Sequence, residues 1–340
     1  MRILLATDAW RPQVNGVVST LEQMTRAATA LGASFDFVTP DAFPTVPLPT
    51  YAEIPLAITN QREFARRVEA SGADHVHIVT EGPIGWTARR YCMDRGLLFT
   101  TGYHTRFPEY VRARTLIPED WTYNLLRHFH APSAAVLAPT PSIRDELTKR
   151  GFTNVRVWTR GVDHDRFRPR AADALGLPRP VFLYVGRVAV EKNLEAFLSL
   201  DLPGSSVVIG DGPARERLTR RFPHAHFLGA RFGDALAEAY ASADVFVFPS
   251  RTDTFGVVLL EALASGLPVA AYPAPGPLDV IGDSGAGVLS EDLRAACLAA
   301  LDIPREAARA RAQSFSWDES ARQFLGHIEE RRAALLNRTA

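Results

Sequence analysis

The sequence predicts an α/β chain folded as two Rossmann-like, doubly wound parallel-sheet domains. Short apolar runs typical of buried strands alternate with helical patterns, and this alternation restarts near residue 181. A chain of 340 residues also exceeds what one hydrophobic core usually organises. The predicted strands are residues 3–7, 35–39, 76–80, 98–101, 135–138 and 155–158 in the first domain, and 181–185, 207–209, 227–228, 245–248, 269–272 and 288–289 in the second.

Helical patterns supply the layers that cover these sheets. A helix that Gly32 ends carries apolar residues at spacings of three and four, namely Val17, Leu21, Met24, Ala28 and Leu31. A last helix begins at Trp317 and has an apolar face made of Ala321, Phe324, Leu325 and Ile328. We expect domains at 1–165 and 166–316, an interdomain linker within 160–180, and a terminal helix at 317–340 that is able to pack back on the first domain.

Composition narrows the classes of function. Lys plus Arg and Asp plus Glu both number 38, so no global charge favours nucleic acid as a partner. Cys92 and Cys297 have no metal-binding or redox spacing, and we interpret both as packing residues in a reduced compartment. The first apolar run is too short for a signal peptide, and no stretch approaches the ~20 apolar residues of a membrane-spanning helix. A cytoplasmic protein is expected.

Glycines and polar side chains follow the strands of the first domain, at the sheet edge where such folds bind ligands. Asn15 and Gly16 open the first helix, where a backbone N–H is able to meet a phosphate, although a tight turn alone explains a single glycine better. Glu81 follows the third strand, and Tyr103 and His104 follow the fourth. If the strand order is the common one, these segments share one edge, which favours a functional role for His104.

The second domain has a more specific pattern. Arg187 and Lys192 follow its first strand on a loop that leads into a helix, an arrangement suited to a diphosphate. Asp253 and Glu261 stand eight positions apart across a helix start, and Glu261 interrupts an apolar helix. Asp253 alone would serve as a helix cap, but a buried glutamate needs a partner, which sugar hydroxyls would supply.

A resemblance that spans both domains rests on Asn15-Gly16-Val17, Gly186-Arg187 with Glu191-Lys192-Asn193, Gly210-Asp211-Gly212-Pro213, and Thr254-Phe255-Gly256 through Glu261-Ala262. Together these segments resemble glycosyltransferase family 4, whose members have the GT-B fold with a donor and acceptor cleft between two domains. A narrower match, through Thr80-Glu81-Gly82-Pro83 and Tyr103-His104-Thr105, resembles bacterial GDP-mannose-dependent mannosyltransferases and enzymes that glycosylate diacylglycerol or phosphatidylinositol.

The resemblance implies a role for each matching residue. Gly16 would offer its backbone to the donor phosphate, and His104 would lie beside the transferred sugar. Arg187 and Lys192 would hold the diphosphate and stabilise its charge as the glycosidic bond breaks. Asp253 would bind sugar hydroxyls and Glu261 the ribose, with further donor contacts at Gly210, Thr254, Phe255, Gly256 and Val257. The family usually has Glu where this chain has Asp253, which is one methylene, ~1.5 Å, shorter.

The implied reaction retains the anomeric configuration, by a front-face route in which the departing phosphate takes the acceptor's proton. No carboxylate pair is placed as the nucleophile and acid/base of a retaining hydrolase. We expect no metal and no cofactor, because Arg187 and Lys192 meet the diphosphate charge. The sequence Asp163-His164-Asp165 and the pairs His75/His77 and His128/His130 lack the setting of a metal site. GDP-mannose and UDP-linked hexoses or hexuronates stay open as donors.

Two rival classes of function are weaker. A nucleotide-dependent oxidoreductase would have a glycine-rich first turn, whereas residues 10–16 contain one glycine. A non-catalytic nucleotide-sugar-binding protein would not need His104, Arg187, Lys192 and Glu261 together.

Basic and aromatic residues are mixed between residues 106 and 130, which suits the surface of an anionic bilayer. The residues expected to face the acceptor or the membrane are Asn15, Glu81, Tyr103, Arg106, Arg112, Arg114 and Trp121. The family resemblance favours a membrane glycerolipid such as diacylglycerol, at the inner membrane surface, over a polysaccharide or a small soluble acceptor. The plainer interpretation puts the aromatic residues in a core and the arginines in solvent.

Overall fold

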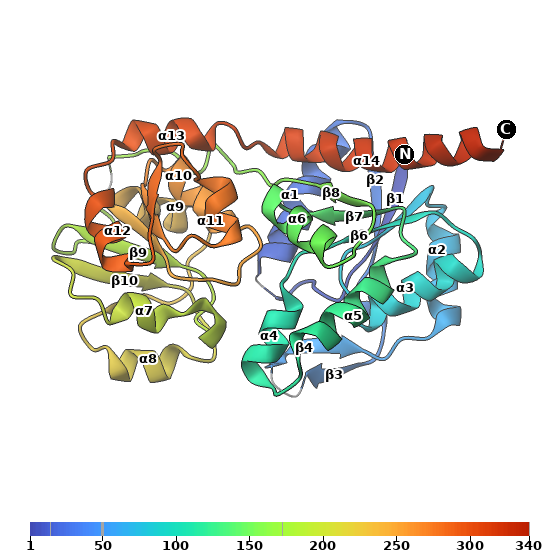
Figure 1. Ribbon diagram of the computed structural model, residues 1–340, viewed down its shortest axis with the longest axis horizontal. Helices are drawn as coiled ribbons and strands as arrows, with labels where there is room; N and C mark the ends of the chain where they lie inside the picture. Colours follow the sequence, from blue (N-terminus) through green and yellow to red (C-terminus); the bar gives the residue numbers. More distant parts are fainter. Residues whose placement is uncertain (14, 49–50, 172, 340) are drawn as a thin grey trace. The chain divides into compact units, whose positions relative to one another are not determined.

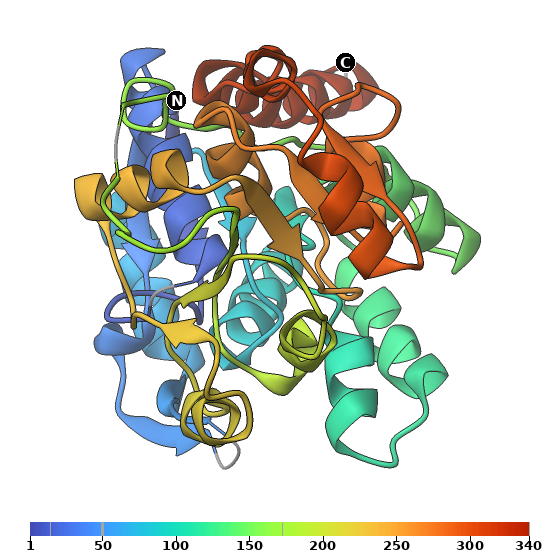
Figure 2. The same cartoon turned by 90° about the vertical axis from the view of Figure 1, so that its left-hand side faces the viewer.

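The computed structural model describes residues 1–13, 15–48, 51–171 and 173–339. The chain divides into unit 1, Met1–Thr159 with Trp317–Ala340, and unit 2, Arg160–Ser316. Each unit has a parallel sheet covered by helices on both faces (Figures 1 and 2). The boundary predicted at residue 165 falls inside unit 2, because Val162 and Phe167 are buried in that unit's core. The start of the predicted linker is therefore packed structure.

The main sheet of unit 1 has the strand order β2-β1-β5-β6-β7-β8, and its neighbouring strands pair in parallel. This order sets the carboxyl ends of β1, β5 and β6 next to one another. The strands are β1 (Arg2–Ala6), β2 (Ser34–Val38), β5 (His75–Ile78), β6 (Phe99–Gly102), β7 (Ala135–Ala138) and β8 (Val155–Val157). All six agree with the sequence prediction within two residues at each end.

An antiparallel hairpin of β3 (Thr45–Leu48) and β4 (Tyr51–Ala57) was not predicted. Its Pro47 and Pro55 lie opposite each other, and prolines within a run argue against a strand.

Helices cover both faces of the unit 1 sheet. Leu21 of α1 and Phe324 of α14 pack on one face, with Ile3 and Leu5 of β1, and Figure 1 shows α14 lying along this unit. Phe64, Ala88 and Phe129, from α2, α3 and α5, pack on the other. The helices are α1 (Gly16–Ala30), the short 3-10 helix η1 (Pro40–Ala42), α2 (Gln61–Ser71), α3 (Pro83–Asp94), α4 (Phe107–Arg114), α5 (Glu119–His130), α6 (Pro141–Lys149) and α14 (Trp317–Thr339).

The sheet of unit 2 repeats this plan with the order β11-β10-β9-β12-β13-β14, again in parallel. The strands are β9 (Val181–Val185), β10 (Ser205–Ile209), β11 (His226–Phe227), β12 (Val245–Phe248), β13 (Val269–Ala271) and β14 (Gly287–Leu289). The helices are η2 (Val190–Lys192), α7 (Leu194–Leu198), α8 (Arg215–Arg221), α9 (Gly233–Ser242), α10 (Val257–Ala264), α11 (Pro275–Val280), α12 (Leu293–Ala300) and α13 (Arg305–Ala312). Strands β9 and β12 are parallel neighbours, so the loops that follow them lie at the same edge of the sheet.

Arginines of α13 fix the ends of three helices that pack on one face of this sheet. Arg305 donates to the carbonyls of Ala241 and Ala243 at the end of α9. Arg309 donates to the Ala264 carbonyl at the end of α10, over 2.7 Å. Arg311 does the same for α11, at the carbonyls of Asp279 and Val280. Cations suit helix carboxyl ends, so α13 holds α10 in place.

Cys92 and Cys297 are free and buried, as expected for packing residues.

Candidate functional site

Two loops of unit 2 lie backbone against backbone at the carboxyl ends of β9 and β10. The Gly186 N–H donates to the Ile209 carbonyl over 3.0 Å. A Cβ on Gly210 would stand 1.8 Å from the Gly186 carbonyl oxygen, and the φ of Gly210 is +145°. Only glycine fits both the space and the conformation. Gly210 is therefore needed to pack the loops, whatever ligand binds beside them.

Arg187 is held at this edge through its backbone. Its carbonyl accepts a hydrogen bond of 2.9 Å from the hydroxyl of Tyr184, a side chain that is buried in β9. A Cβ on Gly186 would stand 2.9 Å from that same hydroxyl. The Arg187 side chain is half-buried, and this hydrogen bond fixes the backbone that carries it.

Lys192 and Asp253 meet across two loops, as an ion pair of 2.5 Å between Nζ and Oδ1. A second contact joins the same loops, because the Asn193 amide donates to the Pro249 carbonyl over 3.1 Å. The loops follow β9 and β12, which are neighbours in the sheet. The topology therefore brings the predicted diphosphate-binding cation against the predicted sugar-binding carboxylate.

The second oxygen of Asp253 is buried without a hydrogen-bond partner among the described residues. The Asp253 side chain is 18% exposed and that of Lys192 is 17% exposed. A withdrawn carboxylate oxygen without a donor is costly. A ligand hydroxyl would satisfy it.

Helix α10 begins beside this pair, at Gly256, whose φ is +83°. Within the described ranges no side chain caps its first turn. The first N–H groups of a helix have no partner inside it and carry partial positive charge. Phe255 and Thr254 are buried, and the ring of Phe255 packs in the unit 2 core. The family resemblance implies donor contacts at Phe255, Gly256 and Val257, and the structure places these three residues at the start of α10.

Glu261 lies one turn further along α10 and is held by a buried tyrosine. Its Oε2 accepts a hydrogen bond of 2.9 Å from the hydroxyl of Tyr240 on α9. Removal from water raises the pKa of Glu261 to about 7, while the Tyr240 hydrogen bond and the charge of Arg166 lower it. Glu261 is half-buried, so part of the side chain stays accessible. Tyr240 was not predicted from the sequence, where it is one more apolar position of a helix.

In unit 1, Asp8 organises the loop after β5 and was also not predicted as a site residue. Its carboxylate accepts from the N–H groups of Ile84 and Gly85, over 2.9 and 3.3 Å, and from the Thr80 hydroxyl over 2.9 Å. A Cβ on Gly82 would stand 2.4 Å from Asp8 Cγ. Burial raises the pKa of Asp8, against these hydrogen bonds. A carboxylate directly after the first strand was the signal that would have found it.

Glu81 extends from the same loop toward a buried histidine. Its Oε1 lies 3.2 Å from Nε2 of His130, whose Nδ1 is 2.8 Å from the Thr101 hydroxyl. His130 is buried, and the Glu81 side chain is 18% exposed. The predicted acceptor residue Glu81 is thus oriented by His130, which the sequence pattern indicates only as part of a possible metal pair.

His104 follows β6 and is half-buried. Its ring packs edge-on against Trp158, with centroids 5.7 Å apart, and a Cβ on Gly102 would stand 2.5 Å from its Nε2. Trp158 is fully buried and donates to the Ser320 hydroxyl of α14 over 3.0 Å. Helix α14 therefore fixes the Trp158 ring against which His104 packs.

Asn15 and Gly16 begin α1. The Asn15 side-chain oxygen accepts from the N–H groups of Val17 and Val18, each over 3.0 Å, which makes Asn15 the helix cap. A Cβ on Gly16 would meet nothing within 4 Å, and Gly16 is exposed. Local packing therefore does not require glycine here.

Two residues predicted to face the acceptor or the membrane lie inside unit 1 instead. Tyr103 is 1% exposed and packs in the core with Tyr123 and Phe152. Arg106 is 15% exposed and lies 2.9 Å from Glu109 and 2.8 Å from Glu146. The prediction that these two residues face the acceptor or the membrane is therefore wrong. Tyr103 is buried, and the Arg106 guanidinium is held in ion pairs with Glu109 and Glu146.

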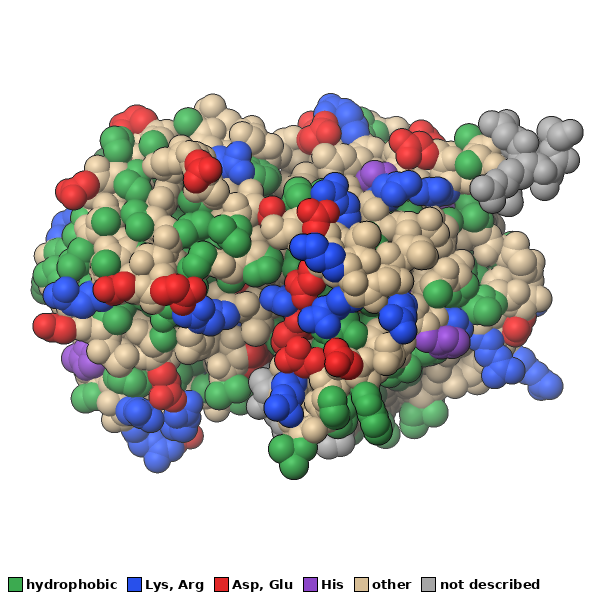
Figure 3. Space-filling view, viewed as in Figure 1, with side chains coloured by type: hydrophobic (Ala, Val, Ile, Leu, Met, Phe, Trp, Pro, Cys, Tyr) green, Lys and Arg blue, Asp and Glu red, His purple; other side chains and the backbone are tan. Residues whose placement is uncertain are grey.

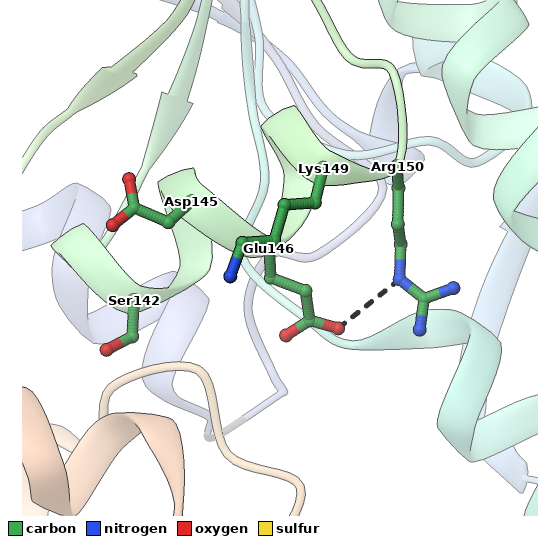
Figure 4. Close-up of a pocket in the computed structure, with 5 residues that line it drawn as sticks. All are labelled: Ser142, Asp145, Glu146, Lys149 and Arg150. Atoms are coloured by element: carbon green, nitrogen blue, oxygen red, sulfur yellow. Dashed lines mark ion pairs between the residues drawn. The ribbon is translucent and has the colours of Figure 1, made fainter.

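Arg106 belongs to a charged network on α4, α5 and α6. Figure 4 shows Glu146 directed toward Arg150 from α6, and their ion pair measures 3.4 Å. Acidic and basic side chains alternate over this part of the surface (Figure 3). A surface pocket of about 460 Å³ lies here, lined by Ser142, Asp145, Glu146, Lys149 and Arg150. It includes none of the predicted donor residues.

The hairpin of α4 and α5 exposes large apolar side chains. Leu116 is 92% exposed and Trp121 is 73% exposed, and Arg112 is also exposed. The other exposed members are Phe107, Ile117 and Leu125. Figure 3 shows hydrophobic side chains at the lower edge of this unit. Arg114 belongs to α4, but its side chain lies outside the described residues.

The histidine pairs noted in the sequence have ordinary partners. His75 and His77 share the Thr100 hydroxyl at 2.9 and 2.8 Å. Asp163 accepts from the N–H of Arg166 over 3.0 Å, so it caps a turn. The described part of the chain holds no group of three metal-ligating side chains, and none of its helices is long and apolar enough to cross a bilayer.

Comparison with known proteins gives matches over both units. The profile of Glycosyltransferase Family 4 matches residues 14–166, and that of Glycosyl transferases group 1 matches residues 179–303. A GDP-mannose-dependent alpha-mannosyltransferase of Mycobacterium tuberculosis is 31% identical over 97% of this chain and 96% of its own length. An alpha-monoglucosyldiacylglycerol synthase of Streptococcus pneumoniae is 28% identical over 88% of this chain and 78% of its own.

The fold is also similar to that of solved structures. A sucrose-phosphate synthase of Thermosynechococcus elongatus superposes with a TM-score of 0.80, covering 98% of this chain and 99% of that one at 20% identity. The predicted fold of two Rossmann-like domains is confirmed.

Proposed function

Because the chain belongs to glycosyltransferase family 4, we propose that it moves a hexosyl group from a nucleotide diphosphate sugar to a membrane glycerolipid, with retention of configuration. GDP-mannose is the first donor to test, since a relative 31% identical over nearly the whole chain is named for it. A UDP-linked hexose or hexuronate is the second. Diacylglycerol is the first acceptor, since another relative is named for a glucosylated form of it.

One observation carries the donor half of this proposal. Lys192 and Asp253 converge at the carboxyl ends of β9 and β12, next to the uncapped start of α10. The Lys192 ammonium is a cation with three N–H donors, and phosphate oxygens are acceptors that suit such a group. Arg187 adds a second cation, and the α10 amides add partial positive charge.

These groups also suit the chemical step. As the anomeric carbon–oxygen bond breaks, negative charge grows on the leaving diphosphate. Fixed cations in a partly buried site stabilise that charge more in the transition state than in the bound donor. The unpartnered Oδ2 of Asp253 would accept from a hydroxyl of the transferred sugar. No metal is assigned a role, because Arg187, Lys192 and the helix start supply the positive charge.

The acceptor half rests on the exposed α4–α5 hairpin of unit 1. Leu116 and Trp121 are exposed at 92% and 73%, and Arg112 of α4 is also exposed. Apolar and indole side chains enter the interfacial layer of a bilayer, and each nearby Arg adds ~1 kcal/mol on anionic lipid. Helix α2 also carries three arginines, Arg62, Arg66 and Arg67. They contribute less to lipid binding than their number suggests, because Arg66 and Arg67 pair with Glu63.

A ligand panel tests the donor assignment. The melting temperature of the protein is measured with GDP, UDP, GDP-mannose and UDP-glucose, because a ligand that binds only the folded state raises it. We expect one nucleotide family to raise it, and Arg187→Ala to keep the unliganded melting temperature but lose most of the shift. No shift with any of the four would contradict a nucleotide-sugar site.

A further inference from the structure

We infer that Tyr240 is a positioning residue of the donor site, which holds the carboxylate of Glu261 so that its other oxygen faces the hydroxyls of the bound nucleoside. The inference rests on the proposed function and on the family resemblance, which implies that Glu261 binds the ribose of the donor. Tyr240 lies on α9 (Gly233–Ser242), a helix that carries none of the predicted donor residues.

The position of the Tyr240 hydroxyl is set by the core. Tyr240 is fully buried, and its ring packs at centroid distances of 5.8 Å from Phe167 and 5.7 Å from Phe246. Phe246 belongs to β12, and α10 follows that strand along the chain. The hydroxyl is thus held at one point relative to the strand end, and its 2.9 Å hydrogen bond fixes Oε2 of Glu261 there.

This single hydrogen bond leaves the carboxylate able to bind a diol. A carboxylate has two oxygens with about four acceptor positions, and Tyr240 fills one of them. Two neighbouring ribose hydroxyls would donate to the remaining positions, and hydrogen bonds to an ionised acceptor are the stronger kind. Burial keeps the pKa of Tyr240 well above its ordinary value, so the phenol stays a donor.

Few charged groups influence the ionisation of Glu261. Its pKa is lowered by Tyr240 on α9 and by Arg166, which precedes β9. On α13, Arg309 is bonded to the Ala264 carbonyl at the far end of α10. The residues of β12 and β13 in this core, Phe246, Phe248, Val269 and Ala271, are apolar. Loss of the Tyr240 hydroxyl therefore leaves Arg166 as the group that still favours the ionised form.

Tyr240→Phe removes the hydroxyl and keeps the ring. The dissociation constants of GDP and UDP are measured by calorimetry from pH 6 to pH 9 with the full chain. In the natural protein we expect affinity for the preferred nucleotide to fall as the pH drops through about 7, where Glu261 takes up its proton. In Tyr240→Phe the midpoint moves to higher pH, and affinity at pH 7 falls about tenfold. The kcat at saturating donor stays close to that of the natural protein.

Two further variants separate the possible failures. Ser242→Ala removes another buried hydroxyl of α9, one that donates to the Glu238 carbonyl over 2.7 Å, so it matches the structural cost without touching Glu261. If Tyr240→Phe shows the same pH profile as Ser242→Ala and the natural protein, the inference is overturned. Glu261→Gln should abolish the pH dependence of nucleotide affinity. Adding Tyr240→Phe to Glu261→Gln should then leave the pH profile of the affinity unchanged. If Glu261→Gln binds as the natural protein does, the placement of Glu261 at the ribose fails as well.

Discussion

Lys192 and Asp253 form an ion pair of 2.5 Å although 61 positions separate them in the sequence. Both side chains are more than four-fifths buried, so their opposite charges meet where little water screens them. The loop that holds the predicted leaving-group cation and the loop that holds the predicted sugar-binding acid are therefore one structural element. They should respond to mutation as one.

We predict that Lys192→Ala lowers kcat/KM about 100-fold, because a preorganised cation at the leaving diphosphate is lost. Asp253→Asn should also lower it, and the double variant should cost less than the product of the single effects. Steady-state kinetics on the three variants measures this. Lys149→Ala, which changes the other lysine of the chain, on α6, is the matched control and should leave kcat/KM unchanged. Strictly multiplicative effects would show that the pair does not act as a unit.

Glu261 should make stability depend on pH in a direction opposite to that of a surface acid. Its pKa is raised from 4.5 to about 7 in the folded chain, so its contribution to stability is fully present below pH 4.5 and is lost as the pH rises to about 7. The loss is at most about 3 kcal/mol. Urea unfolding of the natural protein and of Glu261→Gln at pH 5 and pH 8 measures it. The glutamine variant should lose less free energy of unfolding between these two pH values, and an equal loss would contradict the raised pKa.

Activity should survive removal of divalent metal ions. In the proposed site, Arg187, Lys192 and the start of α10 would supply the positive charge that a bound metal supplies in other transferases, and the described residues offer no cluster of metal ligands. Turnover is measured after treatment with EDTA, with excess Mg²⁺ as the comparison. Loss of turnover that Mn²⁺ restores would contradict a metal-free site.

The exposed hairpin should bind anionic lipid. Sedimentation with phosphatidylglycerol vesicles at low salt should recover the protein, and added salt should release it, because charges at the surface are screened. Leu116→Asp should lower the bound fraction severalfold, since it puts a charge where an apolar side chain enters the interface. Leu97→Asp changes an exposed leucine elsewhere in unit 1 and is the control. Equal loss in both variants, or no binding at all, would move the acceptor toward a soluble sugar.

Much of the fold could be predicted from the sequence because apolar runs mark parallel strands directly. Val181–Val185 and Val245–Phe248 were placed at their observed bounds, since strands buried on both faces read as continuous apolar segments. The β3–β4 hairpin was missed because its prolines hide the pattern. The domain boundary was placed too late because Val162 and Phe167 sit in a polar stretch, and only packing shows that they are buried.

Site residues could be predicted where a local sequence motif contains them. They could not be predicted where their role depends on a contact with a residue far away in the sequence. Lys192, Asp253 and Glu261 follow strands or interrupt an apolar helix, and so stand out. Tyr240, Asp8 and His130 act through partners 21, 72 to 77 and 49 positions away, which no local pattern reveals. A sequence does not distinguish a core aromatic residue or an ion-paired arginine from an exposed one, so it predicts Tyr103 and Arg106 at the surface although both lie within unit 1.

The most direct test is a transfer assay with radiolabelled donor. Purified protein is incubated with GDP-mannose or UDP-glucose, with and without vesicles that contain diacylglycerol, and the label in extracted lipid and the free nucleotide diphosphate are both measured. We predict labelled glycolipid and equimolar nucleotide diphosphate with one donor, dependent on the vesicles and lost in Lys192→Ala. A protein that binds the donor but releases no diphosphate with any lipid, polysaccharide or small sugar acceptor would contradict the assignment as a transferase.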